Sequence, residues 1–260
     1  MNIFLQIEYN GASYSGWQRQ DHAPTIQGEL EKALLTYLNA ERKKNNLDLL
    51  QSVNINGSGR TDAGVHALMQ TANVLLPDDM QINLQRLGMA LNGITPHDIV
   101  VRQARLIDDS FDARHSPHIK CYCYRICDRH MKGGIIGANS WVTGPLSVSP
   151  MIHAARLLEG QHDFQSFRAS DCTAKTTVRT ILRAEVSRSE TQLLELRIIG
   201  KGFLKQMVRI IAGTLVNIGK AQLPAEEILR ILAQQDRRAS GPTAPPNALT
   251  LEWMRYDEAR

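Results

Sequence analysis

Residues 57–76 read GSGRTDAGVHALMQTANVLL, a glycine-rich loop that runs directly into an apolar segment. The pattern predicts a short strand at Val53 and Ile55 that enters the loop, and a strand over 65–76 that leaves it. The loop carries one base and one acid, Arg60 and Asp62. Two interpretations stay open: a surface turn with an incidental ion pair, or a reactive carboxylate that the glycines allow to approach a ligand.

Three generic motifs do not fit this loop. A G-x-G-x-x-G dinucleotide site would need glycine where Asp62 stands, and a carboxylate there would repel a pyrophosphate. A P-loop would end in Gly-Lys-Ser/Thr, and a zinc site would need more ligands near His66. A lone histidine at a strand start is more typical of a hydrogen-bonded core or rim residue. What remains is a carboxylate held between glycines, beside an arginine that could steady it or grip a phosphate.

Working outward, strands and helices alternate in two rounds along the chain. The first round predicts strands over 2–9 and 99–107, a helix that starts at Thr25, and a helix over 83–94. The second predicts strands over 120–127, 178–187, 192–199 and 249–256, and helices over 203–218, 224–234 and from Pro150 to Leu158. The polar stretch at 108–110 predicts the junction between domains 1–108 and 109–260. Because strict βαβ alternation is missing, the fold class is α+β, with helices packed on largely antiparallel sheets.

Composition and charge bound the class of protein. With 260 residues, 43% of them hydrophobic, the chain can bury a sizeable core. No apolar run is long enough to span a membrane, and the N-terminus alternates like a strand rather than a signal peptide. The four cysteines lack the C-x-x-C pairs usual for structural zinc, which favours reduced, packed thiols in a cytoplasmic protein.

The positive charge is concentrated in the second half. Residues 1–130 hold 13 Lys/Arg against 14 Asp/Glu, a net of −1, whereas residues 131–260 hold 17 against 12, a net of +5. Nine basic and four acidic residues lie between Arg168 and Arg209 alone. This surplus fits a polyanionic partner such as a nucleic acid, although an ordinary solvated face has the same charge.

Several ordered motifs resemble one family. The segment RTDAGVHA at 60–67 closely resembles the active-site motif of the TruA family of tRNA pseudouridine synthases. Further segments match in the same order along nearly the whole chain: YNG at 9–11, GWQRQ at 16–20, FDAR at 111–114, YCY at 122–124, HDFQSF at 162–167 and FLKQMVR at 203–209. An ordered series of motifs is far more specific than any one of them.

The resemblance implies an isomerase with two α/β subdomains whose sheets join at a central basic cleft. It implies a homodimer that binds tRNA and converts uridines 38, 39 and 40 of the anticodon arm to pseudouridine. The reaction is an isomerisation, so neither a cofactor nor a metal is formally required. Two alternatives remain: a sibling synthase that modifies other tRNA positions, and a catalytically silent RNA-binding protein with the same fold.

The resemblance also assigns roles to individual residues. Asp62 is the catalytic carboxylate, and Arg209 pairs with it. Tyr122 is the pocket tyrosine that stacks on the target base, whereas Tyr124 is expected in the core. Arg60 is expected to fill the gap left by the flipped base or to hold its phosphate.

Other residues of the matching segments have less definite roles. Phe203 and Val208 are expected to be apolar pocket or core residues. His162 and Phe167 are open between an approach to RNA and a plain loop or core position. The chain departs from the family at Cys121, where a basic or polar residue is common, and at Ala248, where glycine is usual.

Overall fold

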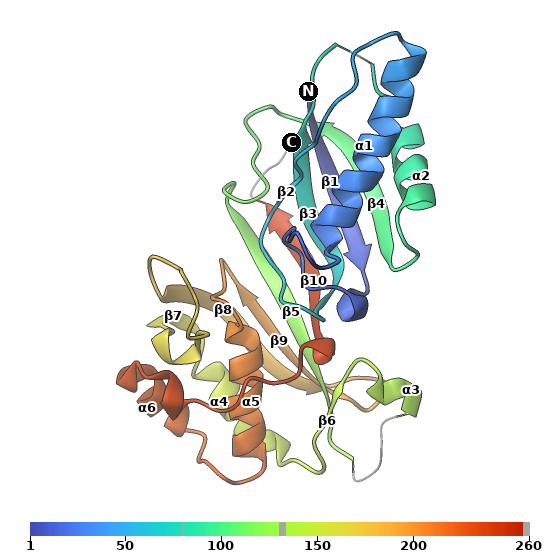
Figure 1. The fold of residues 1–260 in the computed structure, drawn as a ribbon. Helices are drawn as coiled ribbons and strands as arrows, with labels where there is room; N and C mark the ends of the chain where they lie inside the picture. The colour runs from blue at the N-terminus through green and yellow to red at the C-terminus, as the bar shows by residue number, and fades with distance from the viewer. Residues whose placement is uncertain (80, 130–133, 257–260) are drawn as a thin grey trace. The chain divides into compact units, whose positions relative to one another are not determined.

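A computed structural model describes residues 1–79, 81–129 and 134–256 of the chain (Figure 1). The chain divides into two compact units: unit 1 is Met1–His118 with the chain end from Trp253, and unit 2 is Ile119–Glu252. The boundary thus follows His118 rather than Asp108. The physical reason is Phe111, whose ring packs with Phe4 and Tyr256 in a small core of unit 1.

Unit 1 is built on a sheet with strand order β4-β1-β3-β10, and β2 pairs with β3. The pairs of β1 with β3 and β4, and of β2 with β3, are antiparallel. Helix α2 packs on β4 and α1 packs on α2. The elements are β1 (Asn2–Tyr9), the 3-10 turn η1 (Gly11–Ser13), α1 (Ile26–Lys44), β2 (Asn56–Gly57), β3 (His66–Leu75), α2 (Leu84–Ile94), β4 (Ile99–Ile107) and the end of β10 (Leu249–Tyr256).

Helix α1 begins where the sequence predicts. Thr25 is its N-cap, and the Thr25 hydroxyl oxygen accepts a hydrogen bond from the Gly28 N–H. The apolar stripe of the helix is fully or almost fully buried at Ile26, Leu30, Leu34 and Leu38. This start of α1 follows, eight residues later, the segment that supports the Asp62 loop, as shown below.

The strand predicted at Val53 and Ile55 is wrong. Both side chains are buried, but β2 is limited to Asn56–Gly57. The backbone of Ile55 is instead satisfied by helix α1: its N–H donates to Glu31 at 2.9 Å, and its carbonyl accepts from Gln27 at 3.0 Å. Hydrogen bonds from the side chains of α1 therefore take the place of the backbone hydrogen bonds that a strand would make here.

Unit 2 is built on a sheet with strand order β10-β5-β9-β8-β7, and β6 pairs in parallel with β5. The pairs β5–β9, β9–β8 and β8–β7 are antiparallel. Helix α4 packs on β8 and on α5. The elements are β5 (His118–Cys127), α3 (Gly134–Gly137), β6 (Trp141–Val142), α4 (Val148–Arg156), β7 (Gly160–Asp163), η2 (Gln165–Phe167), β8 (Val178–Arg188), β9 (Leu194–Gly200), α5 (Met207–Gly219), α6 (Glu227–Gln234), η3 (Arg237–Ala239) and η4 (Pro246–Ala248).

Several predicted element ends differ in unit 2. Helix α5 begins at Met207 rather than at Phe203, because Gln206 has a left-handed backbone with φ of 60°. Helix α4 begins at Val148 with Ser147 as its N-cap, so Pro150 lies in the first turn, where its missing N–H has no cost. The predicted fold class is confirmed: both units are α+β, and the sheets are largely antiparallel.

Two further predictions can be compared with the described residues. Cys121, Cys123 and Cys127 are buried free thiols, and Cys172 is a half-buried one. In the part of the chain that the structure describes, no helix combines the length and apolar character that crossing a bilayer requires.

Gly88→Ala is expected to stabilise unit 1. Gly88 lies inside α2, and a Cβ built there meets no atom within 4 Å. Alanine in an open helix position gains about 0.5–1 kcal/mol over glycine. Chemical denaturation should show this increase in the free energy of unfolding, and a decrease would contradict the structure. In contrast, Gly213→Ala should destabilise, because its Cβ would lie 1.8 Å from the carbonyl oxygen of Pro242.

Candidate active site

The loop with Arg60 and Asp62 connects β2 to β3 in unit 1. Arg60 is exposed and Asp62 is half-buried. The Val65 N–H donates to the Asp62 carbonyl at 3.2 Å, which closes a tight turn, and Gly64 in this turn has φ of +78°. Only glycine adopts such a backbone without strain. The turn thus holds Asp62 at its start.

A segment near the N-terminus supports this loop; we call residues 11–17 the strap. The Trp17 N–H donates to the Thr61 carbonyl at 3.2 Å, and the Gly64 N–H donates to the Tyr14 carbonyl at 3.2 Å. These two backbone hydrogen bonds lie on either side of Asp62. Gly16 makes the approach possible, because its φ is +94° and a Cβ there would lie 2.6 Å from the Thr61 oxygen.

The beginning of the loop is also fixed. The Gln70 amide nitrogen donates to the Gly59 carbonyl at 3.1 Å, and the Gln70 amide oxygen accepts from the Ser58 hydroxyl at 2.6 Å. Gly57 lies so close to the buried Trp17 ring that a Cβ would be 2.3 Å from the indole nitrogen. The glycines therefore serve close packing of the loop, and the turn is not a loose surface feature.

Tyr122 lies on β5 of unit 2 and is half-buried. Its ring meets Phe203 edge-to-face, with ring centroids 5.1 Å apart and an interplanar angle of 86°. Tyr124 on the same strand is fully buried, and its hydroxyl donates to the Pro245 carbonyl at 2.9 Å. The core position expected for Tyr124 is confirmed, and Tyr122 is the more accessible of the two rings.

Arg209 lies in the first turn of α5 and is half-buried. Its Nε donates to the Ala244 carbonyl at 2.8 Å, and the Ala244 N–H donates to the Arg209 carbonyl at 3.2 Å. This reciprocal pair ties the guanidinium to the segment at 241–245. Gly241 packs against Thr214 of α5, so the segment follows the helix closely.

The remaining candidates in unit 2 lie in buried or hydrogen-bonded positions. Phe167 is fully buried, and His162 lies in β7 rather than in a loop, with its Nε2 2.9 Å from the Glu159 carbonyl. Ala248 is fully buried and Cys121 almost so. Burial, together with the carboxylate of Glu252, raises the pKa of the Cys121 thiol to about 12. Cys121 therefore cannot replace a basic rim residue.

Basic side chains surround the loops that precede α5. Lys201 is exposed, whereas Lys205 forms an ion pair of 2.6 Å with Asp171. The Arg179 guanidinium donates to the carbonyls of Thr176 and Val178. Of these cations, Lys201 is the one we select to test a contact with a polyanion.

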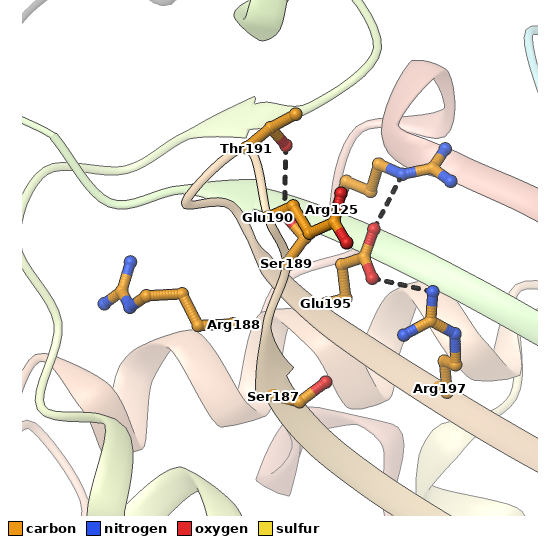
Figure 2. Close-up of a pocket in the computed structure, with 8 residues that line it drawn as sticks. All are labelled: Arg125, Ser187, Arg188, Ser189, Glu190, Thr191, Glu195 and Arg197. Carbon is orange, nitrogen blue, oxygen red and sulfur yellow. Dashed lines mark hydrogen bonds and ion pairs between the residues drawn. The ribbon is translucent and has the colours of Figure 1, made fainter.

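A separate hollow of about 520 Å³ opens in unit 2 (Figure 2). The arginines that line it are paired with acids: Glu195 pairs with Arg125 at 3.2 Å and with Arg197 at 2.7 Å, and Arg188 pairs with Asp128 at 2.8 Å. None of the predicted site residues lines this hollow. A second hollow, in unit 1, is lined partly by Asn56, Asn73 and Asp112 and likewise contains none of them.

Sequence reasoning missed part of this site. It included YNG and GWQRQ in the family resemblance but gave these residues no role, although the strap lies between and within them. The signal was the glycine spacing at 11 and 16, which matches the close approaches of the strap to Val65 and Thr61. His66 is buried at 6% exposure, as expected for a hydrogen-bonded core residue.

Comparisons with known proteins agree with these motifs. A family model described as tRNA pseudouridine synthase matches residues 6–116 and 154–257. The matched ranges contain Arg60, Asp62 and Arg209, and Tyr122 lies between them.

Similar proteins cover almost the whole chain. The tRNA pseudouridine synthase A of Myxococcus xanthus is 40% identical over 97% of this chain and 91% of its own length. The protein of the same name from Thermoanaerobacter sp. (strain X514) is 38% identical over 96% of this chain and 97% of its own. A solved Cbf5-Nop10-Gar1 complex aligns with 98% of this chain and 58% of the other, at 9% identity and a TM-score of 0.32, too low to establish a shared fold.

Proposed function

This chain belongs to the tRNA pseudouridine synthase family, and we propose from that premise that it isomerises uridine to pseudouridine in tRNA. We include the finer assignment to uridines 38, 39 and 40 of the anticodon arm, which rests on the motif resemblance. The observation that supports a catalytic role best is the fixed backbone around Asp62. Two backbone hydrogen bonds between the strap and the loop, one on either side of Asp62, hold this backbone.

The reaction breaks the bond between ribose C1′ and uracil N1 and forms a bond between C1′ and C5. The proton on C5 is lost and N1 gains one, so atoms and electrons balance without an outside reagent. A carboxylate can attack the sugar or the base as a nucleophile, or it can remove a ribose proton. We assign this role to Asp62, and each of these three routes needs the carboxylate to stay close to the target nucleoside.

The target base must leave its stack, at a cost of a few kcal/mol. An aromatic face in the pocket offsets this cost, because stacking on one base contributes about 1–3 kcal/mol. We assign the face to Tyr122, whose ring Phe203 braces edge-to-face. The Tyr122 hydroxyl is also a candidate proton relay. Arg60 is exposed, which suits a group that enters the gap left by the base or holds its phosphate.

We assign to Arg209 the task of pairing with Asp62 and orienting it. The support is that Ala244 already fixes the Nε of the guanidinium. A guanidinium held at Nε can present its two terminal nitrogens to a carboxylate as a fork. No metal or cofactor enters this proposal, because the chemistry is complete with these side chains.

A homodimer in the cytoplasm is part of the proposal. It rests on the family resemblance, and the free thiols suit a reducing compartment. Light scattering should give twice the chain mass of 29.1 kDa. A mass equal to one chain at micromolar concentration would remove the dimer from the proposal without affecting the chemistry.

Tritium release from tRNA transcribed with [5-³H]uridine tests the activity directly, because C5 loses its hydrogen when the new bond forms. We expect time-dependent release with unmodified tRNA and none with a tRNA that lacks uridine in the anticodon arm. Tight tRNA binding without release would support the catalytically silent RNA-binding alternative.

Lys201→Ala is expected to weaken tRNA binding and to make the slope of log affinity against log salt shallower. Each lost phosphate contact changes that slope by about one unit or less. Lys205→Ala should have a smaller effect, because Lys205 already pairs with Asp171. Binding measured between low and moderate salt checks both.

The matched control for Lys201 is Lys43→Ala. Lys43 is also exposed but lies in the last turn of α1, about 25 Å along the helix from Ile26. Its loss should leave the salt slope unchanged. Equal slopes for the Lys201 variant and the parent would show that Lys201 is merely solvated.

A further inference from the structure

Two buried hydroxyl groups meet directly beside Asp62. Tyr9 ends strand β1, and its hydroxyl lies 2.8 Å from the hydroxyl of Thr61, the residue that precedes Asp62. Tyr9 is 2% exposed and Thr61 is 7% exposed. Burial raises the pKa of Tyr9, so the phenol stays neutral and acts as a hydrogen-bonding group. The pair therefore holds a position and does not exchange protons with substrate.

Thr61 is fixed at two points. Its carbonyl accepts from the Trp17 N–H, and its side chain is held by Tyr9. A backbone unit tied at both the carbonyl and the side chain cannot shift without losing a buried hydrogen bond, which costs about 1–3 kcal/mol when a partner is left unsatisfied. The neighbouring Asp62 is therefore limited in how far its Cα can move.

The strap, which contains Trp17, is itself hydrogen-bonded to the first residue of β3. The Gly11 N–H donates to Nδ1 of His66 at 3.1 Å, so Nδ1 is the acceptor nitrogen of that ring. Gly11 lies so close to Val65 that a Cβ would be 1.9 Å from the Val65 carbonyl oxygen. The Tyr9 ring also packs on Trp17, with centroids 6.1 Å apart. These contacts make Tyr9, the strap and the loop one packed assembly.

We propose that Tyr9 and Thr61 are positioning residues for Asp62, and that their hydroxyl pair sets the reach of the carboxylate toward the ribose. This inference rests on the proposed catalytic role of Asp62. Its physical basis is that about 1 Å of misplacement costs about a hundredfold in rate. The pair should therefore affect the chemical step and leave tRNA binding, which depends on distributed phosphate contacts, almost unchanged.

The primary variant is Thr61→Val, which keeps the shape of the side chain and removes the hydroxyl. Under single-turnover conditions with saturating enzyme, we expect the rate of pseudouridine formation to fall about 10- to 100-fold. The dissociation constant for tRNA should stay within about twofold. Thr61→Ser retains the hydroxyl and should recover most of the rate, which a loss of packing alone would not predict.

Thr95→Val is the matched control. Thr95 has the same 7% exposure in unit 1, and its hydroxyl donates to the carbonyls of Leu91 and Ile99 rather than to an atom of the loop at 57–65. Its loss should lower stability and leave the single-turnover rate at the parental value. An equal fall in rate for both threonine variants would overturn the positioning role, because general destabilisation would then explain it.

Tyr9→Phe keeps the ring on Trp17 and provides a second route if Thr61→Val does not fold. Its rate should fall at least as far as that of Thr61→Val, because the Tyr9 hydroxyl also interacts with Gln70. The rate of the double variant should fall by less than the product of the two single effects, because both changes remove the same hydroxyl pair. A parental rate in Tyr9→Phe, with Asp62→Asn inactive, would overturn this inference and leave the proposed function intact. An active Asp62→Asn protein would instead remove the proposed function itself.

Discussion

Asp62→Asn is expected to reduce pseudouridine formation below detection while the protein still binds tRNA. Asparagine keeps the size of the side chain but can neither attack carbon nor accept the proton. No second acidic residue lies in the loop from 57 to 65 to replace it. Affinity should stay within about twofold, because phosphate contacts spread over the surface supply most of it. Single-turnover assays and binding measurements check the two halves of this prediction.

Asp62→Glu should fail as well, although it keeps the charge. The extra methylene moves the carboxylate by about 1 Å or more in a loop that cannot adjust, which costs about a hundredfold. Asp109→Asn is the control for charge, because Asp109 is an exposed acid of unit 1 outside the loop. A folded Asp62→Asn protein with near-normal turnover would show that the loop is a purely structural turn.

Tyr122→Phe is expected to bind tRNA almost normally and to turn over slowly. The ring that stacks on the base is kept, but the hydroxyl that relays a proton is lost, and such groups contribute about a hundredfold or more. Tyr122→Ala should lose the stacking face too, and it should weaken binding by about fivefold or more. Comparison of the single-turnover rate with tRNA affinity separates the two variants.

Tyr124→Phe is the internal control for Tyr122. It removes a tyrosine hydroxyl from the same strand, but that hydroxyl is buried and bonded to the Pro245 carbonyl. The change should lower stability by about 1 kcal/mol and slow the reaction far less than Tyr122→Phe does. Full activity in both Tyr122 variants would remove Tyr122 from the pocket, and the burial of Tyr124 means that it could not take over the role.

Sequence patterns correctly predicted the helices and strands whose formation depends mainly on the burial of one apolar face. The alternation of 2–9 and the stripe of Ile26, Leu30 and Leu34 reflect burial on a single face, and both elements form as expected. The prediction failed at Ile55 because Gln27 and Glu31 satisfy its backbone from a helix about 25 positions away in sequence. It placed the start of α5 too early, at Phe203 rather than Met207, because nothing in the sequence marks the left-handed backbone of Gln206.

In the candidate site too, some residues can be identified from the sequence and others only from the structure. Arg60, Asp62, Tyr122 and Arg209 stand in short motifs, so a resemblance can locate them. The residues that hold them are dispersed and chemically ordinary: Tyr9 looks like any strand tyrosine until its hydroxyl is seen 2.8 Å from Thr61. Ala244 carries no functional group at all, yet its backbone fixes the Nε of Arg209. Such contacts depend on tertiary structure, so residue types alone do not reveal them.

The most direct measurement of the central claim is site-resolved pseudouridine mapping across whole unmodified tRNA transcripts after incubation with the protein. The account predicts pseudouridine at uridines 38, 39 and 40 of the anticodon arm, and none there after incubation with Asp62→Asn. Product confined to uridines outside that arm would contradict the substrate assignment and indicate a sibling synthase. No pseudouridine at any position, despite tight tRNA binding, would contradict the enzyme assignment itself.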